Sequence, residues 1–365
     1  MTFGSLRTLV LSIPFREGLQ LLQISRPCIK IESHLGREIS DFKFSNFAKG
    51  VSSSSSFHLT LRILMDSIVH YTHCPVCGST SIKPVLSAKD YTVSGENFSI
   101  WECRDCTLRF TQDAPGVDAI GRYYKSEDYI SHTNTSRGLI NKLYQAVRKR
   151  TLKQKRQLVC KVTNKKQGSL LDVGSGTGSF VREMKDYGWQ VTGLEPDADA
   201  RRVAKELFHC ELQDSDQLFS LQPDSFDGVT LWHVLEHVHD LTGYLQQLKL
   251  VLRSNGRLII AVPNYTSHDA SAYKENWAAY DVPRHLYHFS PRSMQILMER
   301  MGMQILEYKP MWFDSFYVSL LSSKYKHQGT RWISALWTGV RSNLSALNEG
   351  EKCSSVIYIT SLKKP

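Results

Sequence analysis

Two pairs of cysteines have the spacing of a metal site. Cys74 and Cys77 form one C-x-x-C pair, and Cys103 and Cys106 form a second pair after an interval of 25 residues. Zinc prefers four thiolates in a tetrahedron, and two C-x-x-C turns supply them two at a time. Four protein ligands leave no open position, so the predicted zinc is structural. No thioredoxin-like pattern surrounds either pair, which disfavours redox-active dithiols, and a β-hairpin through 91–100 is expected within the interval.

Three glycines and two carboxylates have the arrangement of a nucleoside-binding loop. The segment Asp172-Val-Gly174-Ser-Gly176-Thr-Gly178 follows an apolar strand and opens a helix. Glycines let the backbone turn sharply and approach a ligand closely beside the helix N-terminus. Glu195 ends the next expected strand, where its carboxylate can accept both hydroxyls of a ribose. The third glycine comes one position too early for the dinucleotide pattern, so the loop predicts a nucleoside cofactor without naming it.

The elements that must position this loop alternate regularly after residue 167. The expected strands cover 169–174, 189–196, 226–232, 257–264, 304–313 and 354–364, and the expected helices cover 178–188, 198–208, 241–252 and 290–302. Repeated β-α units of this kind predict an α/β fold with a doubly wound, mainly parallel sheet.

The 365-residue chain divides into four expected segments. Its composition, 41% hydrophobic and 22% charged, is globular, and no apolar run approaches the ~18 residues of a membrane span. Residues 1–64 show no sustained period, so we expect a disordered extension or a mis-assigned start, with a poorly patterned helical subdomain as the alternative. We expect a zinc-ribbon module at 65–112, a helical basic linker at 113–166 and the main domain at 167–365.

The net charge of +10 is concentrated in the linker. Ten Lys and Arg residues and no acid lie between Lys142 and Lys166. A solvated helix face explains such a run, and a phosphate-bearing or nucleic-acid partner is the alternative. Four of the eight cysteines are scattered singly, which favours a reducing, cytoplasmic compartment over a disulfide framework.

The motifs of residues 169–264 resemble those of the class I S-adenosylmethionine-dependent methyltransferases. LLDVGSGTGSF, LEPD, SFDGVTLWHVLEHV and VLRSNGRLIIAVPN stand in that family's order and spacing. With CPVCGS and DVPRHLYHFSPRS added, the chain resembles bacterial methyltransferases that carry an N-terminal zinc module and are associated with cell-surface sugar or polysaccharide modification. The resemblance implies a Rossmann-like, seven-stranded sheet and covers the chain from about residue 73 onward.

The resemblance also implies which residues hold the cofactor. Asp172, Gly174, Gly176 and Gly178 would line its methionine and ribose, and Glu195 would hold the ribose hydroxyls. The adenine would meet Pro196, Asp197 and either Asp214 or Asp216, and the sulfonium would border Trp232 and His233.

The segment from His233 to His237 reads H-x-x-E-H, the spacing of an inverted zinc-protease motif. It directly follows the expected strand 226–232, where the methyltransferases have a similar LEH sequence, so we reject the protease interpretation. Glu236 and His237 are then expected to brace the loop at the cofactor pocket, or to contact substrate or a divalent ion.

The loop after the expected strand 257–264 gathers aromatic, histidine and arginine side chains. Its candidate substrate residues are Tyr265, Trp277, Tyr280, Arg284 and His288. Such a loop suits a sugar, a polyol or a phosphorylated carrier, and the alternative is an aromatic lid that only packs. Residues 312–317 could supply a second wall. No Asn/Asp-Pro-Pro-Tyr/Phe motif follows the strand 226–232, which disfavours base methylation without excluding RNA.

His285 is the candidate general base, with His237 as its competitor. The proton of an acceptor hydroxyl must leave as the methyl group arrives, and histidine is the side chain that takes a proton near neutral pH. His285 lies in the loop expected to close over the acceptor, beside Arg284.

The sequence therefore predicts a cytoplasmic S-adenosylmethionine-dependent methyltransferase with a structural zinc ion. Its predicted acceptor is a saccharide or another small molecule, methylated at oxygen or carbon. One alternative is an RNA methyltransferase that holds RNA phosphates with the basic segment and the zinc module. Another is a non-catalytic cofactor- or nucleic-acid-binding protein.

Overall fold

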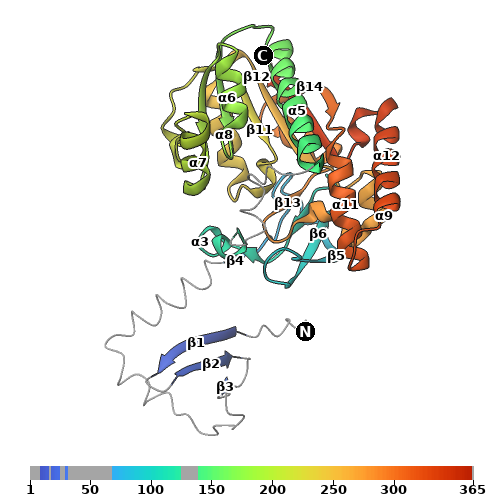
Figure 1. The fold of residues 1–365 in the computed structure, drawn as a ribbon. Coiled ribbons are helices and arrows are strands. Elements are labelled where there is room, and N and C mark those ends of the chain that lie inside the picture. Colours follow the sequence, from blue (N-terminus) through green and yellow to red (C-terminus); the bar gives the residue numbers. More distant parts are fainter. Residues whose placement is uncertain (1–8, 16–17, 25–28, 32–67, 125–138, 364–365) are drawn as a thin grey trace. The chain divides into compact units, whose positions relative to one another are not determined.

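The computed structural model describes residues 9–15, 18–24, 29–31, 68–124 and 139–363 (Figure 1). The chain divides into two units, Met1–Met65 and Asp66–Pro365. The first unit contains an antiparallel sheet in the order β1-β2-β3, which the sequence did not predict. Its strands are β1 (Leu9–Phe15), β2 (Gly18–Ile24) and β3 (Ile29–Ile31). The predictions for 1–64 otherwise fall outside the described residues.

The main sheet of the second unit has the strand order β10-β9-β11-β12-β15-β14. Its strands are β9 (Ser169–Val173), β10 (Gln190–Leu194), β11 (Phe226–Trp232), β12 (Leu252–Pro263), β14 (Met303–Pro310) and β15 (Ser355–Leu362). The first four strands in this order run parallel, and β15 lies antiparallel between β12 and β14. The predicted Rossmann-like α/β fold is confirmed.

The expectation of seven strands is wrong for the part of the chain that the structure describes, where the main sheet has six. Beyond β10, Gln213 forms a single parallel bridge with Leu194. Its N–H donates to the carbonyl of Gly193, and its own carbonyl accepts from the N–H of Glu195. Asp214 then caps a short 3-10 helix, η2 (Ser215–Ser220), so the chain leaves the sheet edge after one residue.

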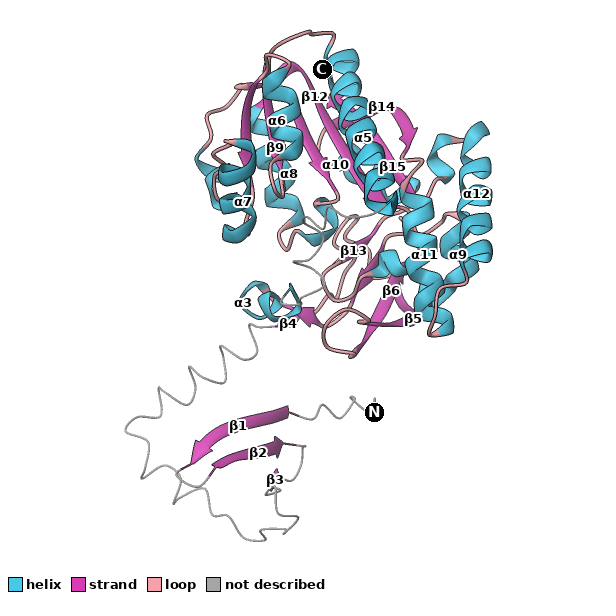
Figure 2. Ribbon diagram, viewed as in Figure 1, coloured by secondary structure: helices cyan, strands magenta, loops and turns pink. Residues whose placement is uncertain are grey.

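Helices cover both faces of this sheet, because alternate strand residues point to opposite sides. Leu170 and Ile259 pack with Val159 of helix α5 (Leu139–Thr163) on one face of the sheet. Leu171 and Ile260 belong to the core cluster on the other face. In Figure 2, α5 and α6 lie in front of the strands. The helices are α3 (Val117–Ile120), α5 (Leu139–Thr163), α6 (Ser179–Asp186), α7 (Ala198–Phe208), α8 (Leu241–Val251), α9 (His268–Tyr273), α10 (Pro291–Arg300), α11 (Asp314–His327) and α12 (Trp332–Asn348).

None of the helices among the described residues is long and apolar enough to cross a membrane. Short 3-10 helices also connect the larger elements: η1 (Gly121–Tyr124), η3 (Leu235–His237), η4 (Lys274–Asn276), η5 (Ala278–Tyr280) and η6 (Gly350–Lys352).

A second sheet, of order β13-β7-β6-β5, carries the cysteine pairs at the ends of its strands, one pair before β5 and the other at the turn from β6 to β7. Its strands are β5 (Ile82–Lys89), β6 (Asn97–Cys103), β7 (Arg109–Thr111) and β13 (Tyr287–His288). β5 and β6 form the predicted hairpin between the cysteine pairs. β13 comes from the loop after β12, so the main domain contributes a strand to this small sheet. β4 (Ile68–Val69), which precedes β5 in the chain, pairs with β8 (Ala114–Pro115), which follows β7.

Arg284 fastens the loop after β12 to the hairpin of the second sheet. Its side chain is 1% exposed, and one of its guanidinium nitrogens lies 3.0 Å from a carboxylate oxygen of Asp90 and 2.6 Å from one of Asp281. Another of its nitrogens donates to the backbone carbonyl of Tyr123 at 2.8 Å. This buried cation holds the loop after β12 and the β5–β6 hairpin together, because separating them would leave the charges of Arg284 and Asp90 buried and unpaired.

We predict that Arg284→Met lowers the free energy of unfolding by about 3–5 kcal/mol, because it leaves the buried Asp90 and the partly buried Asp281 without their cation. Denaturant unfolding followed by circular dichroism measures this change. Arg202→Met is the control, since Arg202 pairs with Asp199 and Glu206 on the exposed surface of α7. Similar, small effects of both substitutions would contradict the clamp role of Arg284.

Candidate functional site

The glycine loop leaves open space at its centre. Gly174, Gly176 and Gly178 have φ angles of 68°, 53° and 77°, a conformation that glycine adopts without strain. A Cβ atom on Gly174 would lie 2.4 Å from Val234, and one on Gly178 would lie 2.9 Å from Ala204. A Cβ atom on Gly176 would meet no atom within 4 Å. The two outer glycines are therefore required by packing, and the middle one faces room for a ligand.

Glu195 lies next to this open centre. One of its carboxylate oxygens accepts from the N–H of Gly176 at 2.7 Å, and the other accepts from the N–H of Asp197 at 3.0 Å. Burial raises the pKa of Glu195, and these two backbone hydrogen bonds oppose the rise. Each oxygen keeps lone pairs that ligand hydroxyls can use. The loop and this carboxylate therefore fit a ribose-bearing cofactor.

Asp172 and Lys155 form the deeper wall of the same region. Asp172 accepts a hydrogen bond from the hydroxyl of Thr230 at 2.7 Å, and burial raises its pKa to about 6. The Lys155 ammonium lies 4.3 Å from the centre of the Trp232 ring. Burial lowers the pKa of Lys155, against the attraction of Asp172 and Asp314. Sequence reasoning missed Lys155, because it lies within the long basic run and no motif marks it.

The other predicted cofactor residues lie around the ends of β10 and β11. Asp197 caps α7 by accepting from the N–H of Ala200, and the Pro196 carbonyl accepts from Arg201. Asp214 is also paired with Arg201, at 2.9 Å. The indole N–H of Trp232 is buried without a hydrogen-bond partner among the described residues.

His233 is held between two carboxylates. Its Nε2 lies 2.8 Å from an oxygen of Asp314, at the start of α11, and its Nδ1 lies 3.3 Å from Glu236. Burial alone would lower the pKa of His233, but the hydrogen bonds and charges of Asp314 and Glu236 raise it to about 10. His233 is therefore a cation at neutral pH and lies at the end of β11 as a fixed charge.

Glu236, His237 and His285 come together behind His233. Each of these three residues offers a potential ligand atom within 4.8 Å of those of the other two. The His237 and His285 rings meet edge to face, with their centres 4.6 Å apart. Burial, together with the charge of His285, lowers the pKa of His237 to about 4, so that this ring is neutral at pH 7.

Backbone carbonyls fix the tautomers of both rings. The Nδ1 of His237 donates to the carbonyl of Arg284 at 3.0 Å, and the Nδ1 of His285 donates to that of Ala279 at 2.9 Å. In the neutral rings this leaves each Nε2 without a hydrogen. One carboxylate oxygen of Glu236 is also buried without a partner among the described residues. The cluster therefore consists of acceptors and could hold a proton or a cation.

Two further residues lie near this cluster, and only Asp281 belongs to a segment that the sequence singled out, DVPRHLYHFSPRS. The hydroxyl of Tyr124 lies 3.0 Å from Nδ1 of His237. A carboxylate oxygen of Asp281 lies 3.9 Å from Nε2 of His285.

The five predicted substrate residues all bond to protein groups, and Trp277, Tyr280 and Arg284 also line a small pocket beside the β5–β6 turn. Arg284 is the buried clamp described above, and Tyr280 accepts a hydrogen bond from Arg109 at 2.8 Å. Tyr265 donates to the carbonyl of Thr107. The indole of Trp277 donates to Asp269, and Nε2 of His288 pairs with the hydroxyl of Thr111. All five are buried in this structure, so their role as substrate contacts stays a prediction.

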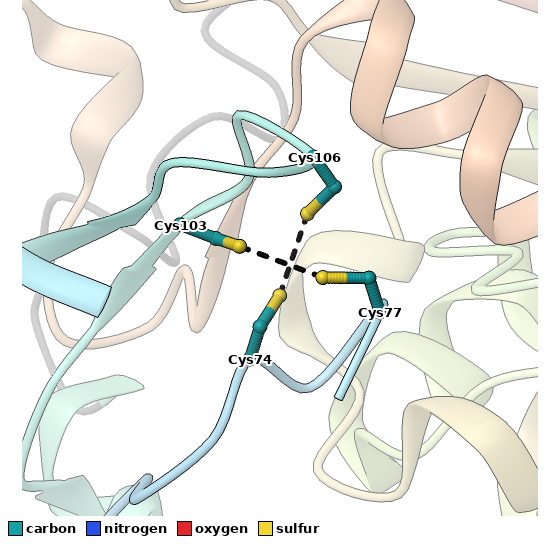
Figure 3. A group of neighbouring side chains, drawn as sticks. All are labelled: Cys74, Cys77, Cys103 and Cys106. Atoms are coloured by element: carbon teal, nitrogen blue, oxygen red, sulfur yellow. Dashed lines mark hydrogen bonds between the residues drawn. The ribbon is translucent and has the colours of Figure 1, made fainter. Parts of the chain in front are cut away.

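The four predicted metal ligands converge (Figure 3). The Sγ atoms of Cys74 and Cys106 lie 3.4 Å apart, and those of Cys77 and Cys103 lie 3.5 Å apart. Tetrahedral zinc bound by thiolates brings sulfurs to about 3.8 Å from one another. The residues after the second cysteine of each pair, Gly78 and Thr107, have matching φ angles of 76° and 61°. Two equivalent turns with inward-pointing sulfurs fit zinc.

The described part of the basic run faces its own domain as well as solvent. Arg156 pairs with Glu183 at 2.8 Å, and Lys165 pairs with Asp227 at 2.7 Å. With Lys155 directed to Trp232, these contacts explain two cations of α5 and Lys165 just after it by packing rather than by an outside partner.

Comparison with known proteins finds similarity to methyltransferases over part of the chain. Residues 144–308 match the model of a methyltransferase domain. An uncharacterized methyltransferase of Alkaliphilus oremlandii is 31% identical over 120 residues, which cover 31% of this chain and 54% of that protein. A ubiquinone biosynthesis O-methyltransferase of Xanthomonas euvesicatoria is 26% identical over 159 residues, covering 40% and 66%. The chain thus spans about half to two thirds of these relatives.

Among solved structures, a SAM-dependent methyltransferase from Archaeoglobus fulgidus is 19% identical, with a TM-score of 0.39, and the match covers 58% of this chain and 93% of that one.

We predict one zinc ion per chain, bound by the four converging cysteines. Elemental analysis of the purified protein measures the zinc content. Cys103→Ser should lose the ion and lower the melting temperature, because a structural zinc site contributes its binding energy to folding. Cys160→Ser, which alters a single cysteine of α5, should keep both values. The site would be excluded if the purified wild-type protein contained no zinc and Cys103→Ser had the same melting temperature as wild type.

We also predict that the stabilising effect of the His233–Asp314 pair falls as pH rises from 7 to 10. The folded-state pKa of His233 lies near 10, above its ordinary value of 6.5. The contribution is therefore complete below 6.5 and disappears as pH passes through about 10. The difference in unfolding free energy between wild type and Asp314→Asn should shrink across this range. A difference that stays constant would show that the pair is not charged.

Proposed function

We propose that the protein is an S-adenosylmethionine-dependent methyltransferase that acts on a small-molecule or saccharide acceptor. The observation that carries the proposal is the open centre of the glycine loop at Gly176 beside the Glu195 carboxylate, within a domain that matches the methyltransferase model. Asp172 and the glycine loop would hold the methionine end of the cofactor. Glu195 would hold the ribose hydroxyls, with Pro196, Asp197 and Asp214 on the adenine side. When bound, the cofactor supplies a methyl group on a sulfonium.

The residues at the end of β11 would form the boundary between cofactor and acceptor. Trp232 presents an aromatic ring, and His233 is held as a cation by Asp314 and Glu236. These two carboxylates neutralise the positive charge of His233 and hold its ring in place. The geometry therefore places a fixed positive charge at His233 next to the cluster of Glu236, His237 and His285.

His285 would remove the acceptor's proton. Its Nδ1 is committed to the carbonyl of Ala279, so Nε2 is the free nitrogen, 3.9 Å from Asp281. Asp281 and Glu236 would stabilise the imidazolium that forms, and His237 would act as a positioning residue through its contact with the His285 ring. The cofactor would supply the methyl group by breaking its bond from carbon to sulfur, with the electron pair staying on the sulfur. The acceptor's bond from oxygen to hydrogen would break as its bond to the methyl carbon forms, and His285 would take the proton on Nε2.

We predict that Glu195→Ala weakens S-adenosylmethionine binding by about 1.5–3 kcal/mol, because the ribose loses a charged hydrogen-bond acceptor. Isothermal titration calorimetry measures the affinity, with Glu206→Ala on the exposed side of α7 as the matched control. Unchanged affinity would refute the ribose assignment. NAD binding as tightly as S-adenosylmethionine would refute the choice of cofactor.

We predict that His285→Ala lowers turnover by about 10²-fold or more while cofactor affinity stays within twofold of wild type. A screen of metabolites and saccharides with radiolabelled S-adenosylmethionine supplies the acceptor for this assay. His327→Ala, an exposed histidine on α11, is the control and should keep full activity. Full turnover in His285→Ala would reject the base. Loss of activity on chelation that leaves the cysteine-bound zinc in place would instead assign the cluster to a catalytic cation.

A further inference from the structure

Helix α12 has its large apolar residues on the side that faces water. Trp332, Ile333 and Trp337 are 63%, 88% and 57% exposed, and Leu344 and Leu347 are 54% and 65% exposed. A surface helix normally buries this kind of residue and exposes its polar ones. In α12 the usual arrangement is reversed, because its large apolar side chains face solvent and not the protein core.

Small residues occupy the buried side of the helix. Ala335, Gly339, Ser342 and Ala346 are the buried positions, spaced three or four residues apart. A Cβ atom on Gly339 would lie 3.2 Å from Cα of Phe316, so the absence of a side chain there lets α12 approach α11 closely. The packing of α12 onto the protein thus uses its small face and leaves its large apolar face uncovered.

The exposed apolar residues form one continuous stripe, which we call the α12 stripe: Trp332, Ile333, Leu336, Trp337, Leu344 and Leu347. At about 100° per residue these positions fall within an arc of about 140°. The arc borders the buried side on one edge and Arg341 on the other. A stripe of this width along a 17-residue helix is an interaction surface rather than a scatter of single exposed side chains.

The segment that carries and precedes the stripe is basic, and acids follow it only at the C-terminal end of α12, at Glu349 and Glu351. Between Asp314 and Glu349 the chain contains Lys324, Lys326, Arg331 and Arg341 and no acidic residue. Two copies of this chain that met through the same stripe would bring these cations together, which opposes a symmetric dimer. A surface of negative charge would attract them instead.

We propose that the α12 stripe docks on the surface of an anionic lipid bilayer, with the helix lying in the plane of the interface. An apolar face with tryptophans, bordered by cations, is the composition of helices that lie in this way. Tryptophan in particular favours the boundary between acyl chains and head groups, where its ring is buried and its N–H stays hydrated. The proposal is independent of methyl transfer, because it concerns only the outer face of α12.

Vesicle co-sedimentation of the full-length protein tests the proposal. We expect the protein to bind vesicles of phosphatidylcholine with 30% phosphatidylglycerol and to bind pure phosphatidylcholine at least fivefold more weakly, with the difference lost at high salt. The triple variant Trp332→Ser, Ile333→Ser, Trp337→Ser should bind at least tenfold more weakly. It removes no buried side chain, and an unchanged melting temperature checks its fold.

A matched double variant, Leu207→Ser with Phe219→Ser, changes exposed apolar residues elsewhere on the second unit and should bind like wild type. Arg331→Gln with Arg341→Gln should weaken binding to the anionic vesicles only. The proposal is overturned if the wild type binds neither kind of vesicle or binds both equally. It is also overturned if light scattering shows a dimer that the triple variant dissociates, since a second copy would then cover the stripe.

Discussion

The position of Leu286 is the constraint on which the rest of the site depends. Its N–H donates to the carbonyl of Glu236 at 2.8 Å, and its carbonyl accepts from the N–H of Thr111 at 2.9 Å. One residue thereby joins the loop after β11, the loop after β12 and the cysteine-bearing sheet. The adjacent β13 extends that sheet by pairing with β7. Because His285 precedes Leu286, its ring is brought against His237 by these backbone bonds, not by side-chain packing alone.

The cysteine module is therefore part of the wall of the site. β6 ends at Cys103, and β7 begins just after Cys106, so the cysteine turns fix the register of both strands. β7 in turn holds the segment that carries His285, and Arg284 fastens the same segment to Asp90 in the hairpin turn. A metal ion at the cysteines would act on the chemistry only through this framework, since it has no open coordination position.

The sequence predicted those features of the site that depend on residues close together in the chain. The C-x-x-C turns, the glycine loop and the alternation of strands and helices depend on residues close together in the chain, and the structure has all three. The pairing of Arg284 with Asp90 could not be predicted, because Asp90 lies 194 residues away and nothing in the local sequence shows it. Lys155 was hidden in a basic run for the same reason. The residue patterns predicted six strands of the main sheet, and the seventh came only from the family resemblance. The described residues have a single bridge at Gln213 beyond β10.

The central claim is that the glycine loop and the Glu236–His237–His285 cluster are two sides of one methyl-transfer site. A crystal structure of the protein with S-adenosylhomocysteine tests it most directly. The account predicts ribose hydroxyls on Glu195, the amino-acid end beside Gly176, and the sulfur directed past Trp232 toward the histidine cluster. A ligand bound elsewhere, or a sulfur directed away from His237 and His285, would contradict it.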